Sequence, residues 1–368
     1  MRKPLQPLAL LAVSAAFLAT PAIAQDTASG DTARPMTARD LVTTPRLGAP
    51  TVSADGTRAL YSVTLTDGDS FTRTTLYRLK TLATGEEVAV AMPEGASSPA
   101  FAGNDWVYFL APGSEGSEST QVWRARIGGD GALGTASQVT RFDRDVGGFK
   151  LAPDGNSIAI LGNVPRECTA FDCEEATPRY APGPGTGMLF DGADGFVRHW
   201  DTYETPGTFA RVFLFPLEGG AAQGPGTAVD GPAGEGALTG DTPVQPFGGL
   251  EDMAWSPGGD ALYFVTRQAG ADEPTSTNTD IYRFAIGESR PANLTDANKA
   301  TDGLPTPSPD GRSLAYLAME RPGYEADRMV VMLRDLASGE TRALTGGFDR
   351  SFGSLAWTPD SRWIIATA

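Results

Sequence analysis

PSPDGRSLAYLAM, residues 307–319, is the clearest copy of a phrase that recurs along this chain. Its segment 308–311 suits a tight turn, because proline presets φ, aspartate can bond the backbone ahead of it, and glycine takes a positive φ without steric cost. Residues 314–319 are apolar at both alternating sets of positions, as in a strand buried on both faces. The phrase therefore predicts a β-hairpin inside a packed sheet.

Related phrases recur at intervals of about 50 residues. They are centred on positions 54, 103, 153, 257, 309 and 359. Each copy has a second half with a strand, a tight turn and an exit strand, as in MVVMLRDLASGETRALT at 329–345. The gap of 104 residues between positions 153 and 257 leaves room for one unmarked copy near position 205. We therefore expect about seven copies.

Two hairpins in each repeat give a four-stranded sheet, which cannot bury both of its faces alone and needs like neighbours. Radial stacking of such sheets is a β-propeller. The sequence thus predicts an all-β protein, a β-propeller of about seven four-stranded blades whose last blade is incomplete.

The last copy runs from Leu355 to Ala368, and its WIIATA segment should be an inner strand with neighbours on both sides. An apolar strand at an open edge is an aggregation hazard. Two alternatives follow. The chain is the amino-terminal part of a longer protein, or amino-terminal strands complete the final blade and close the ring.

Residues 1–24 have the pattern of a signal peptide: a short basic start, an apolar run over residues 5–20, and Ala22-Ile23-Ala24 as the cleavage site. A membrane anchor is disfavoured, because the run is short and is broken by Pro7 and Pro21. We expect cleavage after Ala24, a periplasmic or secreted protein without membrane insertion, a disordered lead-in over residues 25–36, and a propeller domain over residues 37–368.

The charge balance is strongly acidic, with a formal net charge of −16 for the whole chain. Without the leader, 27 basic and 45 acidic residues remain, a net charge of −18. Nucleic acids and anionic membrane surfaces both require clustered Lys and Arg, so neither is an expected partner.

Cys168 and Cys173 are the only cysteines. In an oxidising compartment two cysteines five residues apart in a loop favour a local disulfide over free thiols. Two thiols with no neighbouring histidine make an incomplete metal site. We expect the disulfide to stiffen a loop, and we expect no metal and no cofactor.

Two irregular stretches interrupt the repeats. Residues 163–201 are rich in Pro, Gly and acidic residues and end in a dense polar and aromatic cluster, which is typical of a functional loop of a propeller. Residues 218–241 are mostly Gly, Ala, Pro and Thr and read as a flexible surface loop.

FVRHWDTYETPGTFARVFLFPL at 196–217, VQPFGGLEDMAWSPGGDALYFVTR at 244–267 and FDRS at 348–351 carry a family resemblance. With the repeats, they resemble the propeller domain of prolyl oligopeptidase-family serine peptidases, including dipeptidyl-peptidase V and acylaminoacyl-peptidase-like enzymes. The resemblance implies a propeller over a carboxy-terminal α/β-hydrolase domain that cleaves short units from peptide amino termini.

The resemblance also implies a nucleophilic serine in a GxSxG turn, followed by Asp and His. No GxSxG occurs in the 368 residues, and the single histidine is His199. Acyl transfer needs a base beside the nucleophile and donors for the oxyanion. We therefore expect no catalytic residue in this chain, and a propeller that gates and helps bind peptides for a hydrolase domain in cis.

Arg198, His199, Trp200 and Asp201 form the densest candidate cluster. Arg198 and Asp201 would orient a substrate or contact the hydrolase domain, with Trp200 as an apolar wall. The structural alternative is that Trp200 fills space between blades while Arg198 and Asp201 satisfy buried groups and each other. A lone His199 is a weak candidate for a base or a metal ligand.

Two acidic segments are further candidates. Glu174 and Glu175 follow the expected disulfide, and related dipeptidyl peptidases hold the substrate ammonium with a glutamate pair from a propeller loop. The alternative for Glu174 and Glu175 is a solvated acidic loop. Glu325, Asp327 and Arg328 should form a hairpin loop with local ion pairs, each of small energetic value, or should touch a partner domain.

Three functions compete. The first is a non-catalytic propeller of an exported serine exopeptidase. The second is a stand-alone periplasmic TolB-like propeller that acts as a protein-interaction scaffold. The third, a propeller enzyme with its site in the central channel, would need several His or carboxylates at matching repeat positions, and one histidine argues against it.

Overall fold

The computed structural model of the chain describes residues 34–114, 118–173, 196–199, 202–203, 207–232 and 237–368. The expected signal peptide and residues 25–33 of the lead-in lie outside these ranges. The one α-helix of the described residues, α1 (Ala38–Thr43), is capped by Thr37, whose side-chain oxygen accepts from the backbone N–H of Asp40. None of the helices in the described ranges has the length and apolar character needed to cross a bilayer.

Apart from a small ribbon, the described residues form six antiparallel sheets, which we number in chain order. Sheet 1 contains β1 (Arg46–Leu47), β2 (Thr51–Val52), β3 (Arg58–Thr66), β4 (Arg73–Thr81) and β5 (Glu87–Val90). Sheet 2 contains β6 (Ser97–Ala102), β7 (Trp106–Pro112), β8 (Thr120–Arg126) and β9 (Ser137–Gln138). Sheet 3 contains β10 (Gly148–Leu151), β11 (Ser157–Pro165), β14 (Thr208–Glu218), β15 (Ala221–Ala222) and β16 (Thr227–Ala228).

Sheets 4 and 5 each have four strands in chain order, whereas sheet 6 has two. Sheet 4 contains β17 (Met253–Trp255), β18 (Ala261–Thr266), β19 (Asp280–Ala285) and β20 (Ala292–Asn293). Sheet 5 contains β21 (Asp302–Pro307), β22 (Ser313–Ala318), β23 (Val330–Asp335) and β24 (Thr341–Ala343). Sheet 6 contains β25 (Ser354–Trp357) and β26 (Ile364–Thr367), and a separate ribbon pairs β12 (Arg198–His199) with β13 (Thr202–Tyr203).

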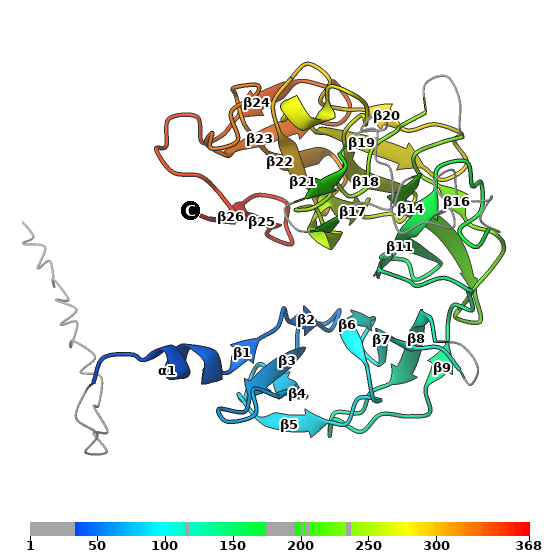
Figure 1. Cartoon of the computed structure of the whole chain (residues 1–368), viewed down its shortest axis with the longest axis vertical. Helices are drawn as coiled ribbons and strands as arrows, with labels where there is room; N and C mark the ends of the chain where they lie inside the picture. The colour runs from blue at the N-terminus through cyan, green and yellow to red at the C-terminus, as the bar shows by residue number, and fades with distance from the viewer. Residues whose placement is uncertain (1–33, 115–117, 174–195, 200–201, 204–206, 233–236) are drawn as a thin grey trace, which may run out of the picture.

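The sheets follow one another around an arc, from sheet 1 in blue to sheet 6 in red (Figure 1). Sheets that stack side by side in chain order are the architecture of a β-propeller, so the prediction of an all-β propeller is confirmed. The described residues form five sheets of four or five strands and two two-stranded ones, β12–β13 and β25–β26, so the expected number of about seven blades is not confirmed.

Near position 205, where an unmarked copy was expected, the described residues form only the two-stranded β12–β13 ribbon and the start of β14. Strand β14 pairs with β11 along nine residues, from Thr208 opposite Pro165 to Pro216 opposite Ser157. The gap of 104 residues is therefore filled by an insertion between the second and third strands of sheet 3 and by a long connection to sheet 4. Spacing alone does not distinguish an extra blade from such an insertion.

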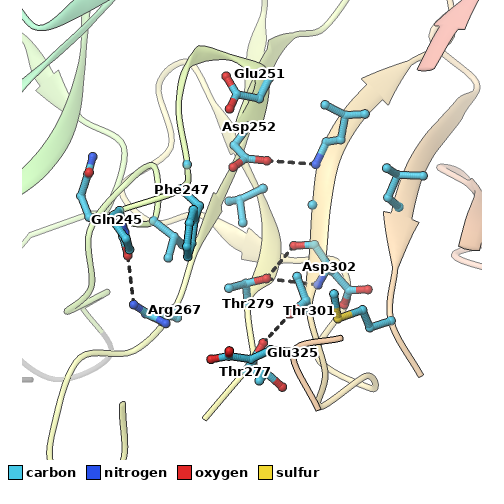
Figure 2. A pocket seen from close by; sticks show the side chains of 18 of the residues that line it. Gln245, Phe247, Glu251, Asp252, Arg267, Thr277, Thr279, Thr301, Asp302 and Glu325 are labelled. Atoms are coloured by element: carbon cyan, nitrogen blue, oxygen red, sulfur yellow. Dashed lines mark hydrogen bonds between the residues drawn. The ribbon is translucent and has the colours of Figure 1, made fainter. Parts of the chain in front are cut away.

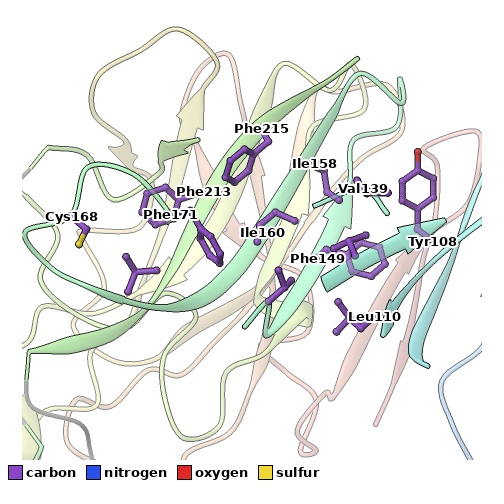
Figure 3. Close-up of a cluster of buried hydrophobic side chains, with 13 residues drawn as sticks. Tyr108, Leu110, Val139, Phe149, Ile158, Ile160, Cys168, Phe171, Phe213 and Phe215 are labelled. Carbon is purple, nitrogen blue, oxygen red and sulfur yellow. The ribbon is translucent and has the colours of Figure 1, made fainter. Parts of the chain in front are cut away.

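The apolar core of the described residues is divided into clusters that each lie between two successive sheets. Alternation along a strand produces this division. On β14, Phe213 and Phe215 belong to the cluster shared with sheet 2, whereas Val212 and Leu214 belong to the cluster shared with sheet 4. Figure 3 shows the first of these clusters. Each buried Phe stabilises by about 1.5–3 kcal/mol, so every sheet needs its neighbours.

The recurrent turn has the predicted chemistry and also links the sheets. Ser308 Oγ donates to Asp310 Oδ1 at 2.6 Å, and Gly311 has a φ of 69°. The N–H of Asp310 donates to Ser361 Oγ of the next sheet at 3.0 Å. In sheet 1 the N–H of Asp55 likewise donates to Asn104 Oδ1 of sheet 2 at 2.9 Å.

The amino-terminal strands belong to the first sheet. Both β1 and β2 pair with β3, and β26 pairs with β25. Sheet 6 is fastened to sheet 5 by Trp357, whose Nε1 donates to Thr306 O at 2.8 Å. In the described part of the chain, the amino-terminal strands thus do not complete the last sheet.

Candidate functional site

The two ends of the sheets differ in their connections. The tight SPDG-like turns join β2 to β3, β6 to β7, β10 to β11, β17 to β18, β21 to β22 and β25 to β26. The opposite end carries the connections that follow β3, β7, β11, β18 and β22, which span residues 67–72, 113–119, 166–207, 267–279 and 319–329. The expected functional insertion therefore emerges at the same end as the longest connections of sheets 4 and 5.

A cavity of about 750 Å³ lies at this end, between sheets 4 and 5 (Figure 2). Its apolar walls come from the connection before sheet 4, from the ends of β18 and β22, and from the start of β21. The apolar residues that line it include Val244, Phe247, Val265, Leu304, Leu317 and Met319. A volume of this size accommodates a small molecule or a short peptide.

Asp252 is the carboxylate that joins the two sheets inside the cavity. It lies in the short 3-10 helix η1 (Leu250–Asp252), and its Oδ1 accepts from the N–H of Leu304 at 3.1 Å (Figure 2). Burial raises the pKa of Asp252, against the hydrogen bond from Leu304, and the neighbouring Glu251 raises it further. Lys150, whose Nζ donates to Met253 O, lies near enough to oppose this shift.

Asp302 is fully buried at the start of β21 and also lines the cavity. Its Oδ1 accepts from Asn298 Nδ2 at 2.9 Å. Burial raises the pKa of Asp302 to about 7, although hydrogen bonds from Asn298 and Thr295 oppose the shift. This carboxyl group therefore changes charge in the neutral pH range.

Arg267 fixes the wall of the cavity opposite Asp302. Its Nε donates to Glu273 Oε1 at 2.7 Å, and both side chains are largely buried. Its Nη2 donates to Gln245 O at 3.1 Å (Figure 2). Its guanidinium lies 5.0 Å from the ring centroid of Phe196. Because Glu273 neutralises Arg267, the lining acids Glu251 and Asp252 are not balanced by this arginine.

The structure places some of the sequence-predicted residues at this cavity. Arg198 lines it from the β12–β13 ribbon, and its exposed guanidinium lies 5.8 Å from the ring centroid of Tyr203. His199 pairs with Thr202 in the same ribbon. Glu174, Glu175, Trp200 and Asp201 lie outside the described residues.

The 319–329 connection contributes Glu325, which is exposed and lines the cavity. Asp327 forms the expected local ion pair, with Arg321 at 2.7 Å. Arg328 instead donates to the carbonyl oxygens of Phe348 and Gly346. The three residues of this loop therefore have three different environments, and only Glu325 belongs to the candidate site.

The base of the 166–207 insertion is held by a disulfide and a buried ion pair. Cys168 and Cys173 form a disulfide with their Cα atoms 6.1 Å apart. Arg211 donates to the carboxylate of Asp230 at 2.6 and 2.9 Å, and its Nη1 donates to Cys168 O at 2.8 Å. Arg144 donates to Cys173 O at 2.9 Å. These bonds fix where the insertion leaves sheet 3.

Asp252, Asp302 and Arg267 were missed by sequence reasoning. A usable signal exists for the two acids, because they lie 50 residues apart, one repeat, and each precedes or opens the first strand of its sheet. No comparable signal marks Arg267. Among the described residues, no group of three or more His, Cys, Asp or Glu side chains is placed to hold a metal ion.

No family model matches the chain. Similar curated proteins include dipeptidyl-peptidase 5 of Porphyromonas gingivalis, 28% identical over 225 residues, which are 60% of this chain and 30% of that protein. Dipeptidyl-peptidase 5 of Aspergillus fumigatus is 26% identical over 356 residues, 92% of this chain and 48% of that protein. The chain resembles the propeller part of a prolyl oligopeptidase-family peptidase.

The fold comparison agrees with the sequence comparison. Pyrococcus horikoshii acylaminoacyl peptidase matches with a TM-score of 0.55 and 15% identity, over 86% of this chain and 42% of that protein. This likeness concerns the fold alone. The chain spans about half or less of the length of the relatives that it matches.

Proposed function

We propose that this chain is the propeller part of an exported serine exopeptidase, and that it gates and helps bind peptide substrates for an α/β-hydrolase domain. Export rests on the leader-like residues 1–24. The peptidase assignment rests on the similarity to dipeptidyl-peptidases 5. The absence of a GxSxG sequence supports a binding role rather than a catalytic one.

The observation that carries the proposal is the cavity between sheets 4 and 5. It combines apolar walls with the carboxylates of Glu251, Asp252 and Glu325. Apolar side chains of a short peptide would pack against Phe247 and Met319. The free ammonium group of the peptide would be held by the carboxylates, since a charged amine requires anionic partners when it leaves water.

Direct titration tests this proposal. The purified chain is titrated by calorimetry with an apolar dipeptide amide that has a free amino terminus, and then with its N-acetylated form. We expect saturable binding of the first and at least about tenfold weaker binding of the second, because acetylation removes a charge-assisted hydrogen bond.

A pair of matched variants locates the binding. Phe247→Ala removes an exposed ring at the cavity, and Phe71→Ala removes an exposed ring from the corresponding end of sheet 1. Phe247→Ala should weaken binding while Phe71→Ala should not. Equal affinity for free and acetylated peptides, or equal loss in both variants, contradicts the proposal.

A further inference from the structure

Sheet 2 contains a buried polar hub at the start of its third strand. Gln121 is fully buried, and its Nε2 donates to Ser119 Oγ at 3.0 Å, to Phe142 O at 3.0 Å and to Arg144 O at 3.2 Å. Its Oε1 accepts from Thr140 Oγ1 at 2.8 Å. The two hydrogens of one amide nitrogen are thus shared among three oxygen atoms.

Sheet 4 has the same local backbone arrangement. In sheet 2 the N–H of Val122 donates to Thr140 Oγ1 at 2.9 Å, and in sheet 4 the N–H of Ile281 donates to Thr295 Oγ1 at 2.9 Å. Val122 and Ile281 are therefore equivalent positions in the two repeats.

By this equivalence, Asp280 takes the place of Gln121, and Asn278 takes the place of Ser119. The substitution of a carboxylate for an amide removes both donor hydrogens from the hub and leaves acceptors only. Asn278 Nδ2 approaches Asp280 Oδ2 at 3.4 Å, so the two side chains are neighbours.

Three buried oxygen atoms of this region have no hydrogen-bond partner among the described residues. They are Asn278 Oδ1, Asp280 Oδ1 and Asp302 Oδ2. Asp280 is 6% exposed and Asp302 is 0% exposed. The N–H of Asp302 donates to Thr279 O at 3.0 Å and Thr279 Oγ1 donates to Asp302 O at 2.8 Å, so Asp302 lies beside the residue that precedes Asp280. Unsatisfied oxygen atoms at this depth are costly and require a donor or a cation.

The nearest basic side chain does not serve this purpose. Lys299 lies on the loop that follows β20, but its Nζ pairs with Asp296 Oδ1 at 2.9 Å, and both side chains are exposed. No ion pair of Asp280 or Asp302 with a basic side chain is formed in the described ranges.

We propose that a calcium ion binds between Asn278, Asp280 and Asp302, in the position that the Gln121 amide fills in sheet 2. Calcium prefers carboxylate and amide oxygens and tolerates irregular geometry, and two carboxylates balance its charge. Thr279 and Asp302 also line the cavity between sheets 4 and 5, so the ion would stiffen one wall of that cavity.

Calcium titration of the chelator-treated full chain tests this site. We expect one calcium ion per chain by calorimetry and a melting temperature that rises with calcium, but not with magnesium or sodium at equal ionic strength. Asp302→Asn should weaken calcium binding by at least about tenfold, because even the loss of a residue that only hydrogen-bonds to a metal ligand lowers metal affinity by this factor.

Two further variants keep the test decisive. Asp280→Gln restores the side chain of sheet 2, so this variant should fold stably and should not respond to calcium. Asp296→Asn alters an exposed acid of the same loop and should bind calcium as the unaltered chain does. The proposal is overturned if the unaltered chain shows no calcium-dependent shift, if sodium stabilises equally, or if Asp280→Gln binds calcium with unchanged affinity.

Discussion

Replacement of Asp230 by Asn should strongly destabilise the base of the insertion in sheet 3. Asp230 and Arg211 are each 4% exposed, and two hydrogen bonds of 2.6 and 2.9 Å join them. The guanidinium also donates to Pro165 O at 3.0 Å and to Cys168 O at 2.8 Å. Asp230→Asn leaves the positive charge of Arg211 buried without its counter-charge.

The structure sets the magnitude of this loss. Removal of one partner from a buried, hydrogen-bonded ion pair costs about 3–5 kcal/mol of folding free energy. We expect about 3 kcal/mol for Asp230→Asn, since the amide oxygen still accepts one bond. The exposed pair Lys299–Asp296 supplies the control, because Asp296→Asn should cost no more than about 1 kcal/mol.

Denaturant unfolding followed by tryptophan fluorescence measures the free energy, and hydrogen exchange at residues 165–168 and 229–231 reports the local loss. The double variant Arg211→Met with Asp230→Leu should recover part of the stability, because it removes both buried charges. A loss below about 1 kcal/mol for Asp230→Asn, or a double variant less stable than the single one, refutes the reasoning.

Two more predictions concern sheets 3 and 5. In calcium-free protein, burial holds the pKa of Asp302 at about 7, above its ordinary 3.8, so the folded state binds the proton more tightly than the unfolded chain. The contribution of Asp302 to the free energy of unfolding should be fully present below about pH 4 and should be lost as pH rises through about 7. A plot of melting temperature against pH between 4 and 8 should show this loss, and Asp302→Asn should flatten it. Gly162→Ala should lower the melting temperature, because a Cβ there would lie 2.6 Å from the ring of Phe171, which is fully buried against Phe213; an unchanged melting temperature would contradict this packing.

Much of the fold could be predicted from the repeat phrase. The SPDG segment specifies its own turn, and the apolar strand after it specifies burial on both faces, so the stacked sheets follow from local chemistry. The number of sheets could not be predicted, because the insertion between β11 and β14 and the long connection to sheet 4 together take up the length of one repeat.

The candidate site was less accessible to sequence reasoning. Arg198 was identified from its dense cluster, but Asp252 and Asp302 are single acids in polar segments, and only stacking of sheets 4 and 5 brings them to one cavity. Burial raises the pKa of both acids, and this burial arises only when sheets 4 and 5 pack against each other. A comparison of acids at matching repeat positions would have found both.

The contacts between turns bear on how the stacked sheets depend on one another for stability. Asp55 bonds to Asn104 and Asp310 bonds to Ser361, so each of these bonds reaches only the adjoining sheet, and every apolar cluster is likewise shared by two neighbours. The stability of such an array is a sum of pairwise terms along one dimension. The loss of one sheet should therefore mainly affect its two neighbours, and a copy inserted or deleted between two others would need to match only the two surfaces it meets.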